Sequence, residues 1–263
     1  MKRVFIVIPA HNEEKRIGKT LRAYSTFFEK MRKKKLIEYE LFIVINNTKD
    51  NTEEVVKKER VLNKRINFAV YLEGGKGFAV KKGFLKGISD NFDLIGFVDA
   101  DMATPPEQYW KLIENINGAE GCVADRYTAH SKIVPAFSFR RIVVSRVFNL
   151  LVRGLYFLGP GDTQCGAKIF TKKTAQKIVN ELTITQWAFD LDLLYICKRN
   201  GYLIRQIPTI WYEVEGGSIN ILKTSIEMFF SIVQLRILRS PGKRFLTILE
   251  PVISKVYKII KKR

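Results

Sequence analysis

The chain has 263 residues, 46% hydrophobic and 12% aromatic, a composition that excludes a disordered protein and suffices for one large α/β core. Its 45 lysines and arginines against 26 aspartates and glutamates give a formal net charge of +19, which indicates a negatively charged partner: nucleic acid, anionic lipid or a phosphorylated substrate. Cys122, Cys165 and Cys197 show no CxxC spacing, so neither a disulfide framework nor a cysteine zinc site is expected, and a reducing cytoplasm is the natural setting.

The first half of the chain alternates short apolar runs with amphipathic stretches. Strands that are apolar throughout, each followed by a helix, are typical of a mostly parallel sheet with helices on both faces. We therefore expect a doubly wound, Rossmann-like α/β domain. The first run is too short for the apolar region of a signal peptide, so a strand is expected there instead. The predicted strands are Val4–Ile8, Leu41–Ile45, Phe68–Tyr71 and Leu94–Val98, and the predicted helices are Lys15–Lys34, Asn51–Leu62 and Phe78–Ile88.

Polar and glycine-rich segments follow each of the four predicted strands. They are Pro9–Glu14, Asn46–Asp50, Gly74–Gly77 and Asp99–Pro106. In doubly wound sheets, ligands bind outside the carboxyl ends of the strands. The four segments are therefore expected to line one ligand-binding crevice.

The strongest chemical signal is Asp99-Ala100-Asp101 at the end of an apolar strand. Two carboxylates at the mouth of a sheet offer hard oxygen ligands to Mg²⁺ or Mn²⁺, and such an ion can bridge a diphosphate. An aspartate at this place can also simply cap the following helix. The other polar strand ends favour the metal interpretation.

Basic segments with an apolar face occupy the second half of the chain. One covers residues 138–158, and two more follow at 219–238 and 245–263. Arginine and lysine beside apolar residues at helical spacing predict helices that lie in a membrane interface. No stretch of about 18 residues lacks charge, so a spanning helix is not expected. We predict a catalytic domain over 1–216, with a membrane-facing helix at 138–158, and membrane-associated basic helices over 217–263.

Several motifs, taken together and in order, resemble the family 2 glycosyltransferases, in particular the branch that forms dolichyl phosphate glucose and its relative that forms dolichyl phosphate mannose. They are Ile8-Pro9-Ala10-His11-Asn12-Glu13-Glu14, Gly75-Lys76-Gly77, Asp99-Ala100-Asp101, Asp162-Thr163-Gln164-Cys165-Gly166-Ala167-Lys168, Trp187-Ala188-Phe189-Asp190 and Ile207-Pro208. The resemblance covers residues 4–240. It implies a GT-A fold, a divalent metal, and inverting transfer of a hexose from a UDP- or GDP-sugar to dolichyl or another polyprenyl phosphate.

The resemblance also implies roles for individual residues. Asp101 would ligate Mg²⁺ or Mn²⁺ and serve catalysis. The residues implied to bind the nucleotide sugar are Pro9, His11, Glu13, Asn46, Lys76 and Asp99. Family members usually carry an acidic pair with Gly-Ser after the second strand, whereas Asn46-Asn47-Thr48-Lys49-Asp50 stands here. Asn46 can accept a hydrogen bond from a nucleotide base but lacks the negative charge of an acidic residue. The identity of the nucleotide base therefore stays undecided.

The second half of the chain is expected to supply the acceptor site. A phosphate monoester has a second pKa of about 6, so a lipid phosphate needs cations to hold it rather than a strong base. The candidate cations are Arg126, Arg140, Arg141 and Lys168, of which Arg126 and Lys168 are also candidates for catalysis. Asp162 would orient an arginine or, with a hydroxyl acceptor, act as base. Asp190 is a further candidate or a helix cap.

Three alternatives to the lipid-phosphate acceptor differ in class. A family 2 enzyme could act on a soluble or glycan hydroxyl. A basic nucleic-acid-binding protein is not expected, since no known nucleic-acid-binding pattern occurs and the acidic strand end would repel phosphates without a metal. A non-catalytic membrane scaffold would tolerate loss of Asp101. We favour a peripheral enzyme at the cytoplasmic face of an anionic membrane.

Overall fold

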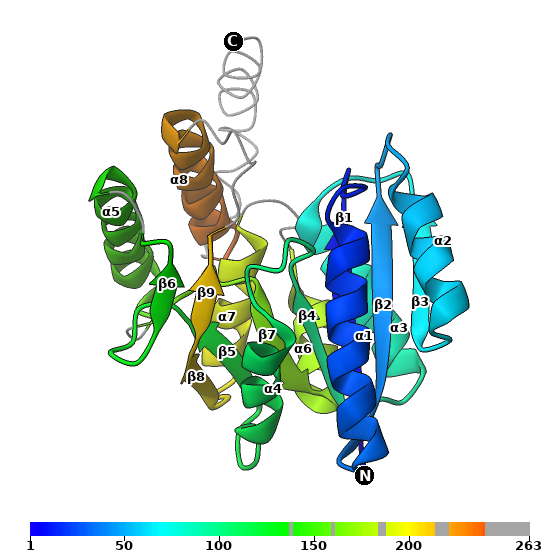
Figure 1. Ribbon diagram of the computed structural model, residues 1–263. Coiled ribbons are helices and arrows are strands. Elements are labelled where there is room, and N and C mark those ends of the chain that lie inside the picture. The colour runs from blue at the N-terminus through cyan, green and yellow to red at the C-terminus, as the bar shows by residue number, and fades with distance from the viewer. Residues whose placement is uncertain (137–138, 159–160, 184–187, 214–220, 240–263) are drawn as a thin grey trace. The chain divides into compact units, whose positions relative to one another are not determined.

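The computed structural model describes residues 1–136, 139–158, 161–183, 188–213 and 221–239, with only the backbone described for 139–141, 143–144 and 221–227. The chain forms two compact units, residues 1–136 with 161–215 and residues 137–160 with 216–263. Figure 1 labels the elements. The strands are β1 (Lys2–Ala10), β2 (Ile37–Asn46), β3 (Ile66–Tyr71), β4 (Leu94–Val98), β5 (Gly121–Asp125), β6 (Lys132–Val134), β7 (Ala167–Thr171), β8 (Ile204–Pro208) and β9 (Ile210–Tyr212). The helices are α1 (Ile17–Lys33), α2 (Thr52–Leu62), α3 (Lys76–Ser89), α4 (Pro106–Glu114), α5 (Phe139–Tyr156), α6 (Lys172–Glu181), α7 (Phe189–Arg199) and α8 (Ile221–Leu238).

The first unit is built on a seven-stranded sheet in the order β3-β2-β1-β4-β7-β5-β8. Neighbouring strands run parallel except for β7, which is antiparallel to both β4 and β5. Each strand and helix predicted in the first half of the chain is confirmed, with bounds that move by a few residues. A mostly parallel α/β sheet is therefore the observed architecture. β6 and β9 form a separate parallel pair.

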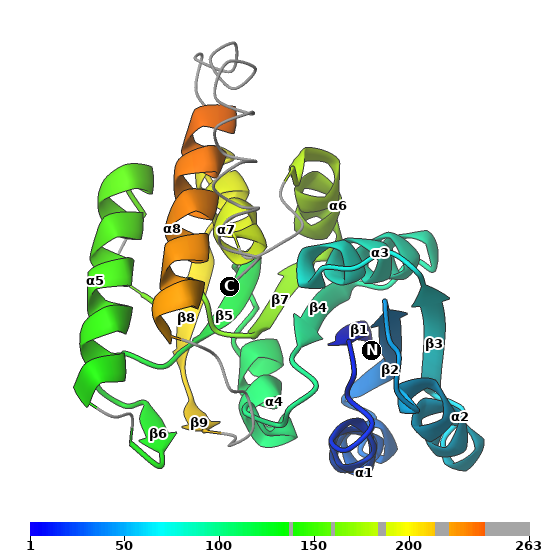
Figure 2. The same cartoon turned by 90° about the horizontal axis from the view of Figure 1, so that it is seen from above.

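Helices cover both faces of the sheet, with α1, α2 and α4 on one side and α3, α6 and α7 on the other (Figure 2). The side chains of β1 explain why its sequence is apolar throughout. Ile6 and Ile8 belong to the core beneath α1, whereas Phe5 and Val7 belong to the core beneath α3. Since successive side chains of a strand point to opposite faces, a strand covered on both sides has no polar positions.

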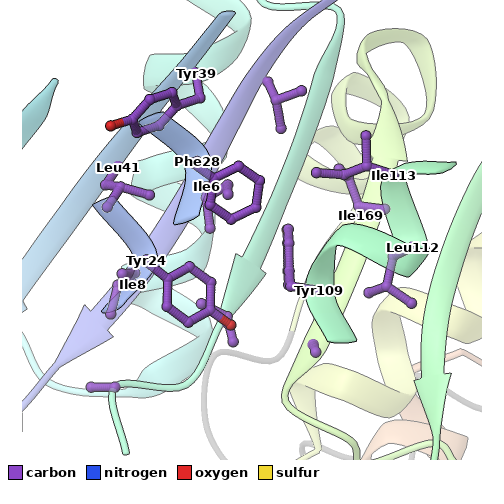
Figure 3. Close-up of a cluster of buried hydrophobic side chains, with 14 of the residues drawn as sticks. Ile6, Ile8, Tyr24, Phe28, Tyr39, Leu41, Tyr109, Leu112, Ile113 and Ile169 are labelled. Carbon is purple, nitrogen blue, oxygen red and sulfur yellow. The ribbon is translucent and has the colours of Figure 1, made fainter. Parts of the chain in front are cut away.

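Aromatic side chains fill the core on the α1 side (Figure 3). Tyr24 and Tyr109 are fully buried, and each has a partner for its hydroxyl group. Tyr24 donates to the Thr104 carbonyl at 2.7 Å, and Tyr109 donates to the Lys168 carbonyl at 3.2 Å. Burying a hydroxyl without a partner is costly, so these two bonds fix the loop after β4 and the strand β7 against the helices.

In the second unit, α5 and α8 pack against each other. Val152, Tyr156 and Leu235 are buried, and the Tyr156 hydroxyl donates to the Ile232 carbonyl at 2.5 Å. The predicted basic helix over 138–158 is thus confirmed as a helix. Across the described ranges, no helix is both long and apolar enough to span a bilayer. The predicted helix at 245–263 lies outside the described residues, and the functional division at 216 stays a prediction.

Candidate active site

The centre of the site lies where β4 ends. The Asp99 amide donates to the Gly166 carbonyl at 3.1 Å, which extends the ladder between β4 and β7 by one residue. Lys76, the first residue of α3, places its ammonium nitrogen 2.5 Å from an Asp99 carboxylate oxygen. The two side chains come from different strand ends and are each about one-third exposed, so they meet at an accessible edge of the sheet.

Burial and the charge of Asp99 raise the pKa of the Asp101 carboxyl above its ordinary value. One oxygen of Asp101 accepts a hydrogen bond from the Ala103 amide at 2.9 Å. Neighbouring Ala100 is bonded to α1, because the Thr20 hydroxyl donates to its carbonyl at 2.6 Å. The loop that carries both carboxylates is therefore fixed against α1.

The chemistry of this donor set suits a hard divalent cation. Carboxylate oxygens are the ligands that Mg²⁺ and Mn²⁺ prefer, and a cation beside Asp99 and Asp101 would offset the burial and the repulsion that raise the Asp101 pKa. Within the described residues there is no group of three or more histidines, cysteines or acids that could hold a metal by itself. A cation here would thus complete its shell with substrate oxygens or water.

The segments after β1 and β2 are joined by side-chain hydrogen bonds. The Asn12 side chain accepts from the Lys49 amide at 2.9 Å, and Glu14 and Asp50 bond to backbone amides of each other's segment. Asn12 and Asn47 adopt the left-handed backbone region, with φ of 56° and 48°, which asparagine tolerates better than most residues. A structural role for these asparagines is a feature that motifs did not reveal, although their position directly after strands was an available signal.

The expected nucleotide residues lie around these segments. His11 is exposed, and its Nδ1 lies 2.9 Å from the Asn46 carbonyl. A carbonyl only accepts, so Nδ1 carries the proton and Nε2 is left as an acceptor. Glu13 makes a two-point ion pair with Arg16 at 2.7 Å for both contacts, and Pro9, one of the last two residues of β1, is partly buried.

Asn46 has a structural environment that its sequence position did not reveal. The residue is 3% exposed, and its side chain lies between the end of β1 and the turn before α3. With the amide group turned so that both neighbours are satisfied, its nitrogen donates to the Ala10 carbonyl at 3.2 Å, and its oxygen accepts from the Gly75 amide at 3.1 Å. With these bonds made, Asn46 joins the end of β1 to the turn before α3, and its role toward a nucleotide stays a prediction.

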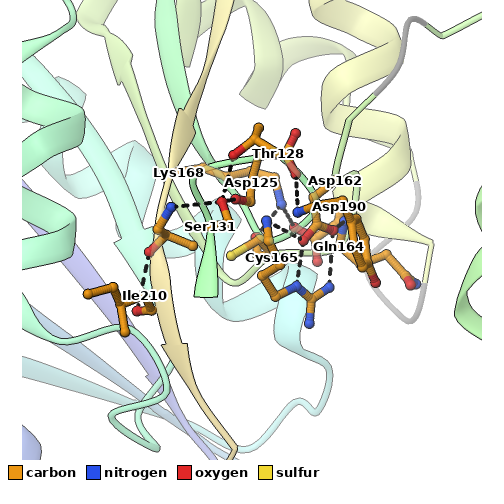
Figure 4. A network of polar contacts seen from close by, with 12 residues as sticks. Asp125, Thr128, Ser131, Asp162, Gln164, Cys165, Lys168, Asp190 and Ile210 are labelled. Carbon is orange, nitrogen blue, oxygen red and sulfur yellow. Dashed lines mark hydrogen bonds and ion pairs between the residues drawn. The ribbon is translucent and has the colours of Figure 1, made fainter. Parts of the chain in front are cut away.

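Arg126 and Asp162 form a buried ion pair. Figure 4 shows Asp162 within a network of polar contacts. Arg126 donates through Nε at 2.5 Å and through Nη2 at 3.0 Å, and its side chain is 12% exposed against 1% for Asp162. Although burial opposes the effect, the Arg126 charge holds the pKa of Asp162 below its ordinary value. The guanidinium also lies 5.2 Å from the centre of the Trp211 ring. Asp162 is thus a fixed carboxylate that orients an arginine.

Lys168 forms a second buried ion pair, with Asp190 in the first turn of α7. Its ammonium also donates to the Cys165 carbonyl at 2.7 Å, and the residue has no exposed surface. Figure 4 shows Lys168 and Asp190 in the same network as Asp162. The ammonium expected at an acceptor phosphate therefore lies in the interior. The side chains of Arg140 and Arg141, and the whole of Trp187, lie outside the described residues.

A Rossmann-like sheet with an Asp-Ala-Asp strand end beside a lysine is the arrangement expected of a glycosyltransferase of the GT-A type. The chain matches the glycosyl transferase family 2 model over residues 5–179 and belongs to that family. Its fold is similar to that of glucosyl-3-phosphoglycerate synthase from Mycobacterium tuberculosis, solved in complex with Mn²⁺, UDP and glucosyl-3-phosphoglycerate. The TM-score is 0.63 at 14% identity, over 89% of this chain and 80% of that chain.

Within the family, the chain is similar to dolichyl-phosphate beta-glucosyltransferases. It is 31% identical to the protein of this name from Dictyostelium discoideum over 242 residues, which cover 88% of this chain and 73% of the relative. The Homo sapiens protein of this name is 30% identical, with 83% of this chain and 70% of the relative covered. The protein is therefore a family 2 glycosyltransferase related to these enzymes.

Proposed function

We propose that the protein is an inverting transferase that moves one glucose from UDP-glucose to dolichyl or another polyprenyl phosphate. Both relatives above carry this acceptor and this sugar in their names, and the solved neighbour contained UDP. The observation that carries the proposal is the meeting of Lys76 and Asp99 beside Asp101 at the end of β4. GDP-mannose stays the alternative donor, because one hydroxyl configuration separates the two sugars.

On the donor side, His11, Glu13 and Pro9 bind the nucleoside, and Lys76 faces the diphosphate. Lys76 keeps its charge there: burial acts to lower its pKa, but Asp99 and Asp190 together raise the pKa above the ordinary value. Asp101, with Asp99 beside it, would hold a divalent cation. Bound Mg²⁺ or Mn²⁺ would supply positive charge to neutralise the leaving nucleoside diphosphate.

On the acceptor side, Arg126 binds the lipid phosphate. Asp162 occupies two of its donors and fixes the guanidinium plane against Trp211, which leaves the remaining N–H groups for an anion. The phosphate is already largely dianionic near neutral pH, so the reaction needs positioning more than proton removal. The lowered pKa of Asp162 makes it a poor general base, which favours this acceptor over a hydroxyl group.

The second unit brings the enzyme to its lipid. The exposed side of α5 and the residue after it carry both arginine and large apolar residues. They are Ile142, Arg146, Leu150, Arg153 and Phe157, with Leu150 and Phe157 more than two-thirds exposed. Such a face suits the headgroup region of an anionic membrane, and we propose attachment to its cytoplasmic surface.

The test uses purified protein with Mn²⁺, phytanyl phosphate and one donor at a time: UDP-glucose, GDP-mannose or UDP-GlcNAc. We expect a glycosylated lipid from UDP-glucose, with a β-glucosyl phosphate linkage by NMR. A parallel reaction offers a glycan hydroxyl in place of the lipid. Transfer to the hydroxyl alone would reject the lipid acceptor, and failure of every donor would reject the proposal.

A further inference from the structure

Two residues of the segment that begins β7, Gly166 and Lys168, lie beside the strand end that carries Asp99. Phe97 pairs with Lys168 in the register of β4 and β7, and the Asp99 amide bonds to the Gly166 carbonyl. Residues two apart on a strand point to the same face, so Gly166 and Lys168 share the face on which α3 presents Lys76.

Gly166 leaves the space that the Asp99 carboxylate occupies. A Cβ atom at position 166 would lie 1.9 Å from one Asp99 carboxylate oxygen and 2.3 Å from its carbon. Real Cβ atoms do not approach that closely, so with a side chain at 166 something must shift, and the Asp99 carboxylate, at the end of a side chain, moves more easily than the backbone. A carboxylate that moved would leave the Lys76 ammonium, which it contacts at 2.5 Å.

Lys168 forms an ion pair with Asp190, a second acidic residue near Lys76. Asp99, Lys76, Asp190 and Lys168 form a series in which acids and bases alternate: Lys76 pairs with Asp99, and Lys168 pairs with Asp190. The Lys76 ammonium also lies 5.7 Å from the centre of the ring of Phe189, the residue before Asp190, which places Lys76 near the charge of Asp190. The ammonium groups of Lys76 and Lys168 both lie near the Phe97 ring, at 5.7 and 5.3 Å from its centre.

We infer that Gly166, Lys168 and Asp190 are positioning residues that keep Lys76 on Asp99 and aim both at the nucleotide diphosphate. Lys168 satisfies Asp190, so that this buried carboxylate does not draw Lys76 away from the crevice. Gly166 keeps the other partner, Asp99, in reach. The inference rests on the proposed function only in assigning Lys76 and Asp99 to the nucleotide.

The experiment measures UDP and GDP binding to the full chain by calorimetry, with and without Mn²⁺ and without any acceptor. For Gly166→Ala we expect UDP to bind about tenfold or more weaker, with a melting temperature within about 2 °C of the parent. Gly154→Ala is the matched control, because a Cβ there meets nothing within 4 Å. It should leave UDP affinity unchanged.

Lys168→Met tests the charge series. It leaves Asp190 with Lys76 as its remaining partner in the series, so we expect UDP affinity to fall about tenfold. Adding Asp190→Asn removes the competing carboxylate, and the double variant should recover to within about threefold of the parent. A purely structural ion pair would instead lower the melting temperature of the single variant without changing nucleotide affinity.

Unchanged UDP affinity in folded Gly166→Ala overturns the inference, even where Lys168→Met fails to fold. A double variant that binds no better than Lys168→Met overturns the part assigned to Lys168 and Asp190. A parent that binds neither UDP nor GDP overturns both this inference and the proposed function. Normal UDP binding without sugar transfer contradicts the proposed function alone.

Discussion

Replacing Asp162 with asparagine should destabilise the protein strongly, because it breaks a buried two-point ion pair. The Asp162 side chain is 1% exposed and that of Arg126 is 12% exposed, so water cannot solvate the guanidinium that loses its charged partner. Breaking such a pair costs about 3–5 kcal/mol, and the amide oxygen keeps one acceptor, so we expect about 3 kcal/mol. For a unit of this size that lowers the melting temperature by about 6–12 °C.

Differential scanning calorimetry at neutral pH measures this change, with Arg126→Met/Asp162→Leu as the companion. The double variant buries no unpaired charge, so it should be at least as stable as Asp162→Asn. The pair also predicts acid sensitivity. The pKa of Asp162 is lowered in the folded state, so its contribution is complete above about pH 4 and is lost as the pH falls through the folded value. A melting temperature of Asp162→Asn within about 2 °C of the parent would refute the assignment of a buried, stabilising pair.

Three further predictions concern the metal, the thiols and the membrane face. Asp101→Asn should reduce turnover by about 10²–10³ with an unchanged melting temperature, measured on UDP-glucose and phytanyl phosphate; near-normal turnover with the same metal requirement would remove Asp101 from the site. Burial raises the thiol pKa of Cys122 to about 11 and of Cys165 and Cys197 to about 12. The contribution of the three thiols to stability is therefore complete below about pH 9 and falls as the pH rises toward their raised pKa values. Iodoacetamide should label the thiols only after unfolding, and rapid labelling of the native protein would contradict their burial. Leu150→Glu should lower co-sedimentation with phosphatidylserine vesicles several-fold, whereas Leu36→Glu, an exposed change in the other unit, should not; equal sedimentation would remove α5 from the interface.

Motifs identified Asp162 and Asp190 as candidate site residues but left the role of each undecided. Asp162 could be expected to orient an arginine or to act as a base, and sequence reasoning could not decide between them. Its two-point contact with Arg126 and its lowered pKa favour the first role. Asp190 could be a helix cap or a functional residue, and its ion pair with buried Lys168 connects it to the site without exposing it to substrate.

Two features could be predicted from the amino-acid pattern alone: the alternation of strands and helices, and the polar segments at the strand ends. Both are local properties: a strand buried on two faces must be apolar throughout, and the carboxyl ends of parallel strands meet at one edge. Lys76 and Asp99 could therefore be predicted to share a crevice, and the structure brings them to 2.5 Å.

The partners of the charged residues depend on the three-dimensional arrangement of the strands. The insertion of β7 antiparallel between β4 and β5 puts Gly166 against Asp99 and buries Lys168 beside Asp190, and no local pattern encodes that strand order. Asn46 likewise has the sequence position of a ligand-binding residue, but packing turned its amide inward to Ala10 and Gly75. A side chain's type can be read from the chain, whereas its burial, its partner and hence its charge state depend on contacts between distant segments.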